Sequence, residues 1–293
     1  MSRIENAMQK AIQRRQGDPA CVEPQELPAH LVDAQPAPTP TEPAEPPAPV
    51  APQVSAQYGR LKPEGPFLVN LHDQHSGTAE EYRKLKSVLV KMTKENDLFR
   101  NAIMITSSVA SEGKSLTAVN LSLSLAQELD HTVLLIDADL RRPSLHRYLN
   151  IEQGPGLSDI LSGKAEIGET IIPTGIGKLS IIRAGGMVDN PAELFSSLKM
   201  EGVVQELKHR YPDRYLIFDA PPVLPFAETR SLAHLVDGVL FVVRERLASQ
   251  VQVSDALEAL KGCERLGLVY NAASLTGDDG RYSYYRGNEG KQP

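Results

Sequence analysis

The segment Ser111-Glu112-Gly113-Lys114-Ser115 contains residue types that can bind the phosphates of a nucleotide. It follows an apolar run ending at Thr106 and precedes Leu116-Thr117-Ala118-Val119-Asn120-Leu121, which has a helical pattern. In a loop placed between a strand and a helix, backbone N–H groups surround the phosphates, a lysine reaches the β and γ oxygens, and a serine hydroxyl binds Mg²⁺. The predicted nucleotide-binding residues of this loop are Ser111, Glu112, Gly113, Lys114, Ser115 and Leu116.

This loop departs from the full phosphate-loop pattern, G-x-x-x-x-G-K-[ST], because Ser108 stands where the first glycine belongs. Gly-Lys-Ser also occurs by accident at helix starts, so the loop alone leaves both nucleotide binding and coincidence open.

Three aspartates follow other apolar runs. Asp137 and Asp139 come after Leu134-Leu135-Ile136, and Asp219 comes after Leu216-Ile217-Phe218. Open α/β folds bind ligands at the carboxyl ends of their strands, and a fixed carboxylate there can hold Mg²⁺ beside phosphates. A single strand-end aspartate is usually a turn former or a helix cap. Three of them together with Gly-Lys-Ser favour a magnesium and nucleotide site instead.

The elements that position these residues follow from short apolar runs separated by longer helical patterns. Runs that are apolar on both faces indicate a parallel sheet covered on both sides. We therefore expect an α/β protein of the P-loop NTPase fold, with a mostly parallel central sheet and helices on both faces. The expected strands are 102–105, 133–136, 179–182, 215–218, 239–243 and 266–269.

Composition divides the chain into four parts. Residues 1–17 contain Ile4, Met8 and Ile12 at a helical spacing and predict a short amphipathic helix, for which docking on a partner and a functionless terminus are both open. Residues 18–77 include a stretch rich in Pro, Ala, Glu and Gln, which predicts a disordered linker. The globular domain is expected at 78–276, and a flexible tyrosine-rich tail at 277–293.

The bulk properties argue against several classes of protein. A net charge of −6 gives no reason to expect nucleic-acid binding. Two cysteines make a disulfide framework or a cysteine metal cage improbable. No stretch resembles a secretion signal or a membrane span, so we expect a cytoplasmic protein that a partner holds at the inner face of the membrane.

Together the motifs resemble the bacterial tyrosine kinases (BY-kinases) of capsule and exopolysaccharide synthesis, particularly their stand-alone cytoplasmic autokinases. The resemblance covers about residues 78–286. It rests on Gly113-Lys114-Ser115 as Walker A, Asp137-Ala138-Asp139-Leu140-Arg141 as Walker A′ and Asp219-Ala220-Pro221-Pro222 as Walker B. Asn190-Pro191-Ala192-Glu193-Leu194 and the C-terminal tyrosines are also similar to the family.

The resemblance implies ATP and Mg²⁺ as cofactors and a catalytic set of Lys114, Asp137, Asp139 and Asp219. Ser115, Asp139 and Asp219 would bind the metal, and Asp137 would accept the proton of the tyrosine, although the sequence cannot order Asp137 and Asp139. Asn271 follows a strand where related proteins contact adenine, and a turn-forming role remains open. Arg141 belongs to the motif, or is simply a surface arginine.

The resemblance also implies a homo-oligomer, possibly a ring. Glu80, Arg83 and Lys86 resemble the E-x-x-R-x-x-R assembly motif, with lysine in place of the second arginine. Intrahelical surface pairs are the alternative. Tyr282, Tyr284 and Tyr285 would be the phosphate acceptors. The implied partners are a membrane polysaccharide co-polymerase as activator and a tyrosine phosphatase.

Two other functions remain open. A partitioning ATPase of the MinD/ParA kind shares this predicted site, but those proteins have a second lysine early in the loop, where this chain has Val109. A non-catalytic scaffold of polysaccharide assembly is also possible because Ala110-Ser111 replaces the Pro-Gly common in BY-kinases. Loss of that glycine restricts the backbone near the phosphates.

Overall fold

A computed structural model describes residues 61–63, 65–94 and 99–274. These residues form one seven-stranded sheet with the order β3-β4-β2-β5-β1-β6-β7. All neighbouring strands are parallel except β3 and β4, which are antiparallel. The strands are β1 (Ala102–Ser107), β2 (Thr132–Asp137), β3 (Ile171–Pro173), β4 (Leu179–Ile182), β5 (Arg214–Asp219), β6 (Gly238–Arg244) and β7 (Arg265–Asn271).

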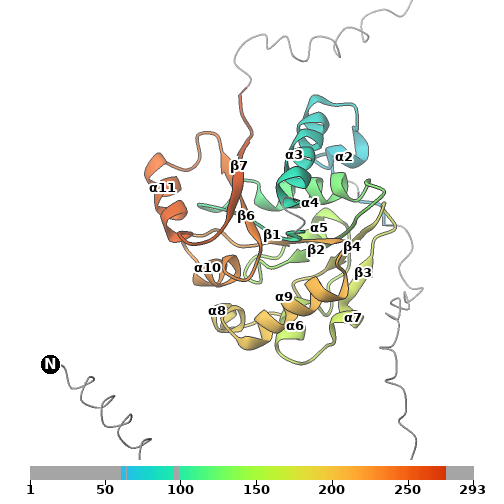
Figure 1. Cartoon of the computed structure of the whole chain (residues 1–293), viewed down its shortest axis with the longest axis vertical. Coiled ribbons are helices and arrows are strands. Elements are labelled where there is room, and N and C mark those ends of the chain that lie inside the picture. The colour runs from blue at the N-terminus through green and yellow to red at the C-terminus, as the bar shows by residue number, and fades with distance from the viewer. Residues whose placement is uncertain (1–60, 64, 95–98, 275–293) are drawn as a thin grey trace, which may run out of the picture. The chain divides into compact units, whose positions relative to one another are not determined.

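Helices cover both faces of the sheet, as the sequence predicts. Figure 1 shows α2, α3 and α4 together on one face and α8, α9 and α10 on the other. The helices of the first half are α2 (Val69–His72), α3 (Gly77–Thr93), α4 (Lys114–Leu125), α5 (Leu145–Tyr148), α6 (Leu157–Leu161) and α7 (Ile167–Thr170). Those of the second half are α8 (Pro191–Phe195), α9 (Leu198–Arg210), α10 (Ala227–Ala233) and α11 (Gln250–Ala259).

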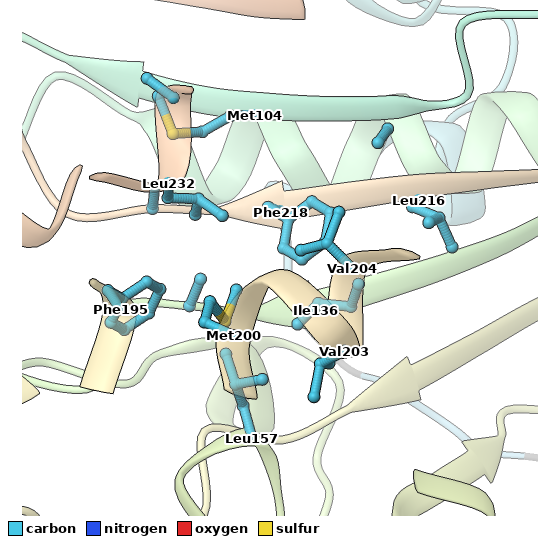
Figure 2. Close-up of a cluster of buried hydrophobic side chains, with 14 of the residues drawn as sticks. Met104, Ile136, Leu157, Phe195, Met200, Val203, Val204, Leu216, Phe218 and Leu232 are labelled. Carbon is cyan, nitrogen blue, oxygen red and sulfur yellow. The ribbon is translucent and has the colours of Figure 1, made fainter. Parts of the chain in front are cut away.

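Each central strand contributes to two cores because successive side chains point to opposite faces of the sheet. Ile103 of β1 faces the core under α4, whereas Met104 faces the other core. Figure 2 shows Met104, Ile136 and Phe218 with side chains from α8, α9 and α10. Both faces are thus buried, which explains why the strands are uninterrupted apolar runs.

The fold differs from the sequence prediction at two places. Strand β3 was not expected, since its three residues are too few to form a recognisable apolar run. The ordered domain also begins before residue 78. Leu68 is fully buried, and Asn70 of α2 donates a hydrogen bond to the carbonyl of Asn120 in α4 at 2.8 Å. The linker boundary at 77 is therefore too late, because α2 is only four residues long and gives no periodic signal.

Candidate active site

The predicted site residues meet at the carboxyl edge of the sheet. Strand β1 leads into the phosphate loop, and the neighbouring strands β2 and β5 end at Asp137 and Asp219, which are paired in register. Helix α4 begins directly after the loop, at Lys114. Asp139 is buried two residues beyond β2. The sheet therefore brings together four groups that lie as many as 105 residues apart in the sequence, from Lys114 to Asp219.

Lys114 lies between carboxylates from two strands. Its Nζ atom is 2.9 Å from Oδ2 of Asp139, 3.6 Å from Oδ1 of Asp219 and 3.2 Å from Oγ of Ser115. Burial disfavours the charged ammonium, but attraction to Asp219 and Asp139 outweighs burial and raises the pKa of Lys114. Lys114 is thus a fixed cation at the N-terminus of α4. The lysine and the helix N-terminus would both attract an anion such as phosphate.

Asp137 is buried and only partly hydrogen-bonded. Its Oδ2 accepts the backbone N–H groups of Ser144 and Leu145, both at 3.1 Å, whereas Oδ1 has no hydrogen-bond partner among the described residues. Burial, and then the nearby Asp219, raise the pKa of Asp137 to about 8, although the two N–H groups oppose the shift. One oxygen therefore anchors the start of α5 and the other is free to accept a proton.

Asp219 is completely buried, and neither of its carboxylate oxygens has a hydrogen-bond partner in the described part of the chain. Burial raises its pKa, and the Lys114 ammonium opposes that shift. Buried carboxylate oxygens without hydrogen bonds are costly, and the 3.6 Å ion pair of Oδ1 with Lys114 compensates only one of the two oxygens. Asp219 and the nearby Ser115 hydroxyl consequently have the oxygen donors that a magnesium ion prefers.

The described residues contain no group of three or more His, Cys, Asp or Glu side chains arranged as a metal cage.

The backbone of the phosphate loop has a positive φ at two positions. Ser111 has a φ of 69° and Gly113 a φ of 90°. A Cβ atom on Gly113 would lie 2.0 Å from Nδ2 of Asn271, so only glycine fits there. Ser111 takes the left-handed conformation that a glycine would adopt more easily. The absence of glycine at this position therefore does not prevent the loop from curving.

Side chains from distant strands hold this loop in place. The buried carboxylate of Glu112 accepts the N–H of Val109 at 2.8 Å and that of Arg244, at the end of β6, at 3.3 Å. Asn271 donates from Nδ2 to the carbonyl of Glu112 at 2.8 Å and also accepts the N–H of Ala272 through Oδ1. The side chains of Glu112 and Asn271 therefore stabilise the conformation of the phosphate loop in this structure. The adenine contact of Asn271 stays a prediction.

Leu116 is in the first turn of α4 and its side chain packs against the core under that helix. Any contact of Leu116 with phosphate would therefore come from its backbone. Ser108 is fully buried, and its hydroxyl has no hydrogen-bond partner within the described ranges.

Two residues that hold the site together were missed by the sequence prediction. Glu228 of α10 is 1 % exposed and pairs with Arg141 of the Walker A′ segment, with 2.5 Å between Oε1 and Nε. The Arg141 guanidinium also lies over the Phe226 ring. Arg244 contacts the loop through its backbone and through a side-chain bond to the Ser111 carbonyl. No sequence signal links these residues, because their partners are 87 to 133 positions away.

Comparisons with known proteins give the family. The model described as "ParA: NUBPL iron-transfer P-loop NTPase" matches residues 99–290. The tyrosine-protein kinase YwqD of Bacillus subtilis (strain 168) is 32% identical over 220 residues, which cover 74% of this chain and 90% of that protein. The chain belongs to the P-loop NTPases of the bacterial tyrosine-protein kinase family.

Further relatives of this kinase agree. The putative tyrosine-protein kinase CapB of Staphylococcus aureus is 27% identical, over 73% of this chain and 93% of that protein. The structure of the kinase domain of the Escherichia coli tyrosine kinase ETK matches with a TM-score of 0.65 and 28% identity. That match covers 77% of this chain and 88% of the ETK chain.

The predicted assembly residues of the kinase lie on helix α3. On α3, Arg83 pairs with Glu80 of the same helix at 2.6 Å, and Lys86 pairs with Glu128 at 2.6 Å. The intrahelical alternative for Glu80 and Arg83 is thus present within one copy of the chain. Tyr282, Tyr284 and Tyr285, together with residues 1–60, fall outside the described residues. Among the helices that the structure does describe, none has the length and apolar character needed to cross a membrane.

Proposed function

We propose that this tyrosine kinase uses Mg·ATP to phosphorylate Tyr282, Tyr284 and Tyr285 of a neighbouring copy of the chain, and that this reaction regulates exopolysaccharide or capsule synthesis. The observation that carries the proposal is the placement of Lys114 between Asp139 and Asp219, next to carboxylate oxygens that lack hydrogen-bond partners among the described residues. A fixed cation beside oxygen ligands for a metal suits a phosphoryl group that must be aligned and neutralised.

Each residue has a defined part in the proposed reaction. Ser115 and Asp219 would hold Mg²⁺, with Asp139 as the other carboxylate on the metal side. The metal, when bound, neutralises the charge that develops on the phosphate oxygens. Lys114 does the same from the protein, and the N-terminus of α4 orients the phosphates.

Asp137 would act as the general base. A tyrosine hydroxyl has a pKa near 10 and needs a group to take its proton. The bond between the γ phosphorus of ATP and its bridging oxygen breaks, a bond from the tyrosine oxygen to that phosphorus forms, and the tyrosine proton passes to Oδ1 of Asp137. ADP leaves. The unpartnered Oδ1 supports this assignment.

The proposed partners and location rest on the family resemblance. They are a membrane polysaccharide co-polymerase that activates the kinase at the inner face of the membrane, and a tyrosine phosphatase that reverses the reaction.

Incubation with γ-labelled ATP and Mg²⁺ tests the proposed function. We expect labelled phosphotyrosine in the wild type and none in Lys114→Met. Free labelled phosphate without labelled protein would instead indicate a partitioning-type ATPase. Neither product, with or without a candidate activator, would indicate a scaffold. Labelling that survives Lys114→Met would contradict the proposed site.

A further inference from the structure

Two exposed arginines, Arg142 and Arg147, lie on the segment whose backbone is bonded to Asp137 and Asp139. Asp139 accepts the backbone N–H of Arg142 through Oδ1 at 3.0 Å. Asp137 accepts the N–H groups of Ser144 and Leu145, which start α5, and Arg147 follows on that helix. The Arg147 guanidinium is directed back along the segment, with Nη2 3.5 Å from the Pro143 carbonyl. The carboxylates of the site thus fix the backbone that carries both arginines.

These two guanidinium groups are not neutralised. Arg142 and Arg147 are exposed, and neither forms an ion pair in the described part of the chain, whereas the adjacent Arg141 is paired with the buried Glu228. We call Arg142 and Arg147 the cationic pair. The charged groups that face it include His146, where burial first and then Arg147 lower the pKa, so this histidine adds little positive charge at neutral pH. The uncompensated positive charge on the segment from Arg142 to Arg147 therefore comes from the cationic pair itself.

The proposed acceptor segment has a complementary feature in its sequence. Asp278 and Asp279 precede Tyr282 by four and three residues. An extended chain advances at most ~3.6 Å per residue, so these carboxylates are within about 15 Å of the tyrosine backbone. Arg281 and Arg286 flank the tyrosine cluster, so residues 278–286 carry no net charge. Asp278 and Asp279 instead form a local pair of negative charges that a local positive surface can bind.

We propose that the cationic pair selects acceptor tyrosines preceded by acidic residues, by binding the carboxylates of Asp278 and Asp279 of another copy. This inference rests on the proposed function and names its substrate class: tyrosine peptides with two adjacent aspartates before the tyrosine. Exposed ion pairs add modest affinity, but they fix which residue of a bound peptide lies opposite which residue of the site. An acceptor tyrosine needs this alignment in order to approach Asp137. Arg142 and Arg147 are then specificity-determining residues.

The test separates donor from acceptor. The donor is the full chain with Tyr282→Phe, Tyr284→Phe and Tyr285→Phe, so it cannot label its own cluster. The acceptor is the full chain with Lys114→Met, so it cannot label itself. Initial rates are measured at increasing acceptor concentration, before a first phosphate can influence a second. Arg265→Glu in the donor is the matched control, because Arg265 is exposed at the start of β7, at the opposite edge of the parallel sheet.

We expect Arg142→Glu with Arg147→Glu in the donor to raise the acceptor KM about tenfold with little change in kcat. Asp278→Lys with Asp279→Lys in the acceptor should have a similar effect. When the charge-reversed donor is combined with the charge-reversed acceptor, the KM should return most of the way to its original value. A donor that is merely misfolded would show no such recovery. High salt should raise the acceptor KM of the unmodified donor and reduce the difference in KM between it and the charge-reversed donor. The Arg265→Glu control should match the unmodified donor.

An acceptor KM that is insensitive to either charge reversal would overturn the inference, as would losses that combine without recovery. In both cases the parent donor still labels tyrosine, so the proposed function survives. If the parent pair yields no phosphotyrosine while the wild type labels other residues, the proposed acceptor fails and the inference fails with it.

Discussion

Asp137 and Asp219 end neighbouring strands, and the charge of Asp219 makes ionisation of Asp137 less favourable. Burial raises the pKa of both groups, and nearby carboxylates add to the shift. The backbone N–H groups of Ser144 and Leu145 oppose it at Asp137, and Lys114 and Ser115 oppose it at Asp219. This arrangement stores unfavourable charge in the absence of a cation. A divalent ion or a substrate proton relieves it, and such perturbed carboxyl groups are common where catalysis occurs.

The pKa of Asp137 predicts how stability depends on pH in metal-free buffer. The folded protein holds a proton on Asp137 up to about pH 8, whereas the unfolded chain loses it near pH 4. Between these values the folded state binds more protons, so Asp137 makes stability fall as pH rises. Asp137→Asn removes this contribution, keeps an oxygen for the N–H groups of Ser144 and Leu145, and should be more stable than the wild type, increasingly so from pH 5 to about pH 8.

Denaturant unfolding in EDTA at several pH values measures this effect. Asp139→Asn is the contrasting variant, because it removes the 2.9 Å partner of Lys114 and should destabilise the protein. An Asp137→Asn stability difference that stays constant across the pH range would show that Asp137 is ionised throughout. The same variant should lose tyrosine phosphorylation, since its amide cannot accept the proton.

At the scale of elements, the sequence predicts the strands and the edge of the sheet at which the site lies. It does not predict the side-chain contacts that join distant segments around the site. Apolar runs such as 133–136 are strands because both faces are buried, and a parallel sheet must bring their carboxyl ends to one edge. The convergence of Asp137 with Asp219 follows from that geometry. The left-handed conformation of Ser111 does not, because it depends on contacts from Arg244 and Asn271 to the loop. Short elements such as β3 and α2 likewise depend on packing partners that are distant in sequence.

The tie between Arg141 and Glu228 should stabilise the junction of the Walker A′ segment with α10. Removing one partner of a buried pair is costly, but Arg141 is 38% exposed and can be hydrated, so we expect Glu228→Gln to lose about 1–2 kcal/mol of unfolding free energy. Glu206→Gln breaks the exposed pair with Arg210 and should change stability by less than ~0.5 kcal/mol. Equal stability of the two variants in denaturant unfolding would contradict a structural role for Glu228.

At the scale of the whole molecule, the proposed chemistry in trans requires that copies of the chain meet. Helix α3 presents Glu80 and Arg83, which pair with each other in one copy and would have to exchange partners in an assembly. Lys86 is already paired with Glu128, and its hydrogen bond lowers the pKa of that carboxyl group. Assembly through this helix therefore competes with contacts that exist in the single copy.

Self-association through α3 can be tested with neighbouring pairs on the same helix. Glu80→Ala with Arg83→Ala should lower the oligomer mass of the unphosphorylated Lys114→Met protein, with little change in stability, because an exposed intrahelical pair contributes only ~0.5 kcal/mol. Glu81→Ala with Lys84→Ala removes the adjacent intrahelical pair and is the matched control. Light scattering reports the mass. Equal masses for the two double variants, or a strict monomer at high concentration in the parent, would contradict assembly through Glu80 and Arg83.

The most direct test of the central claim is the location of the transferred phosphate. Wild type, Lys114→Met and the variant with Tyr282→Phe, Tyr284→Phe and Tyr285→Phe are incubated with Mg·ATP, and intact mass and phosphopeptides are measured. We predict phosphate on the three tyrosines of the wild type, none on Lys114→Met, and the loss of most phosphate from the triple-phenylalanine variant. An unchanged phosphate content in the triple-phenylalanine variant, or phosphotyrosine formed by Lys114→Met incubated by itself, would contradict a kinase that phosphorylates its own C-terminal cluster from this site.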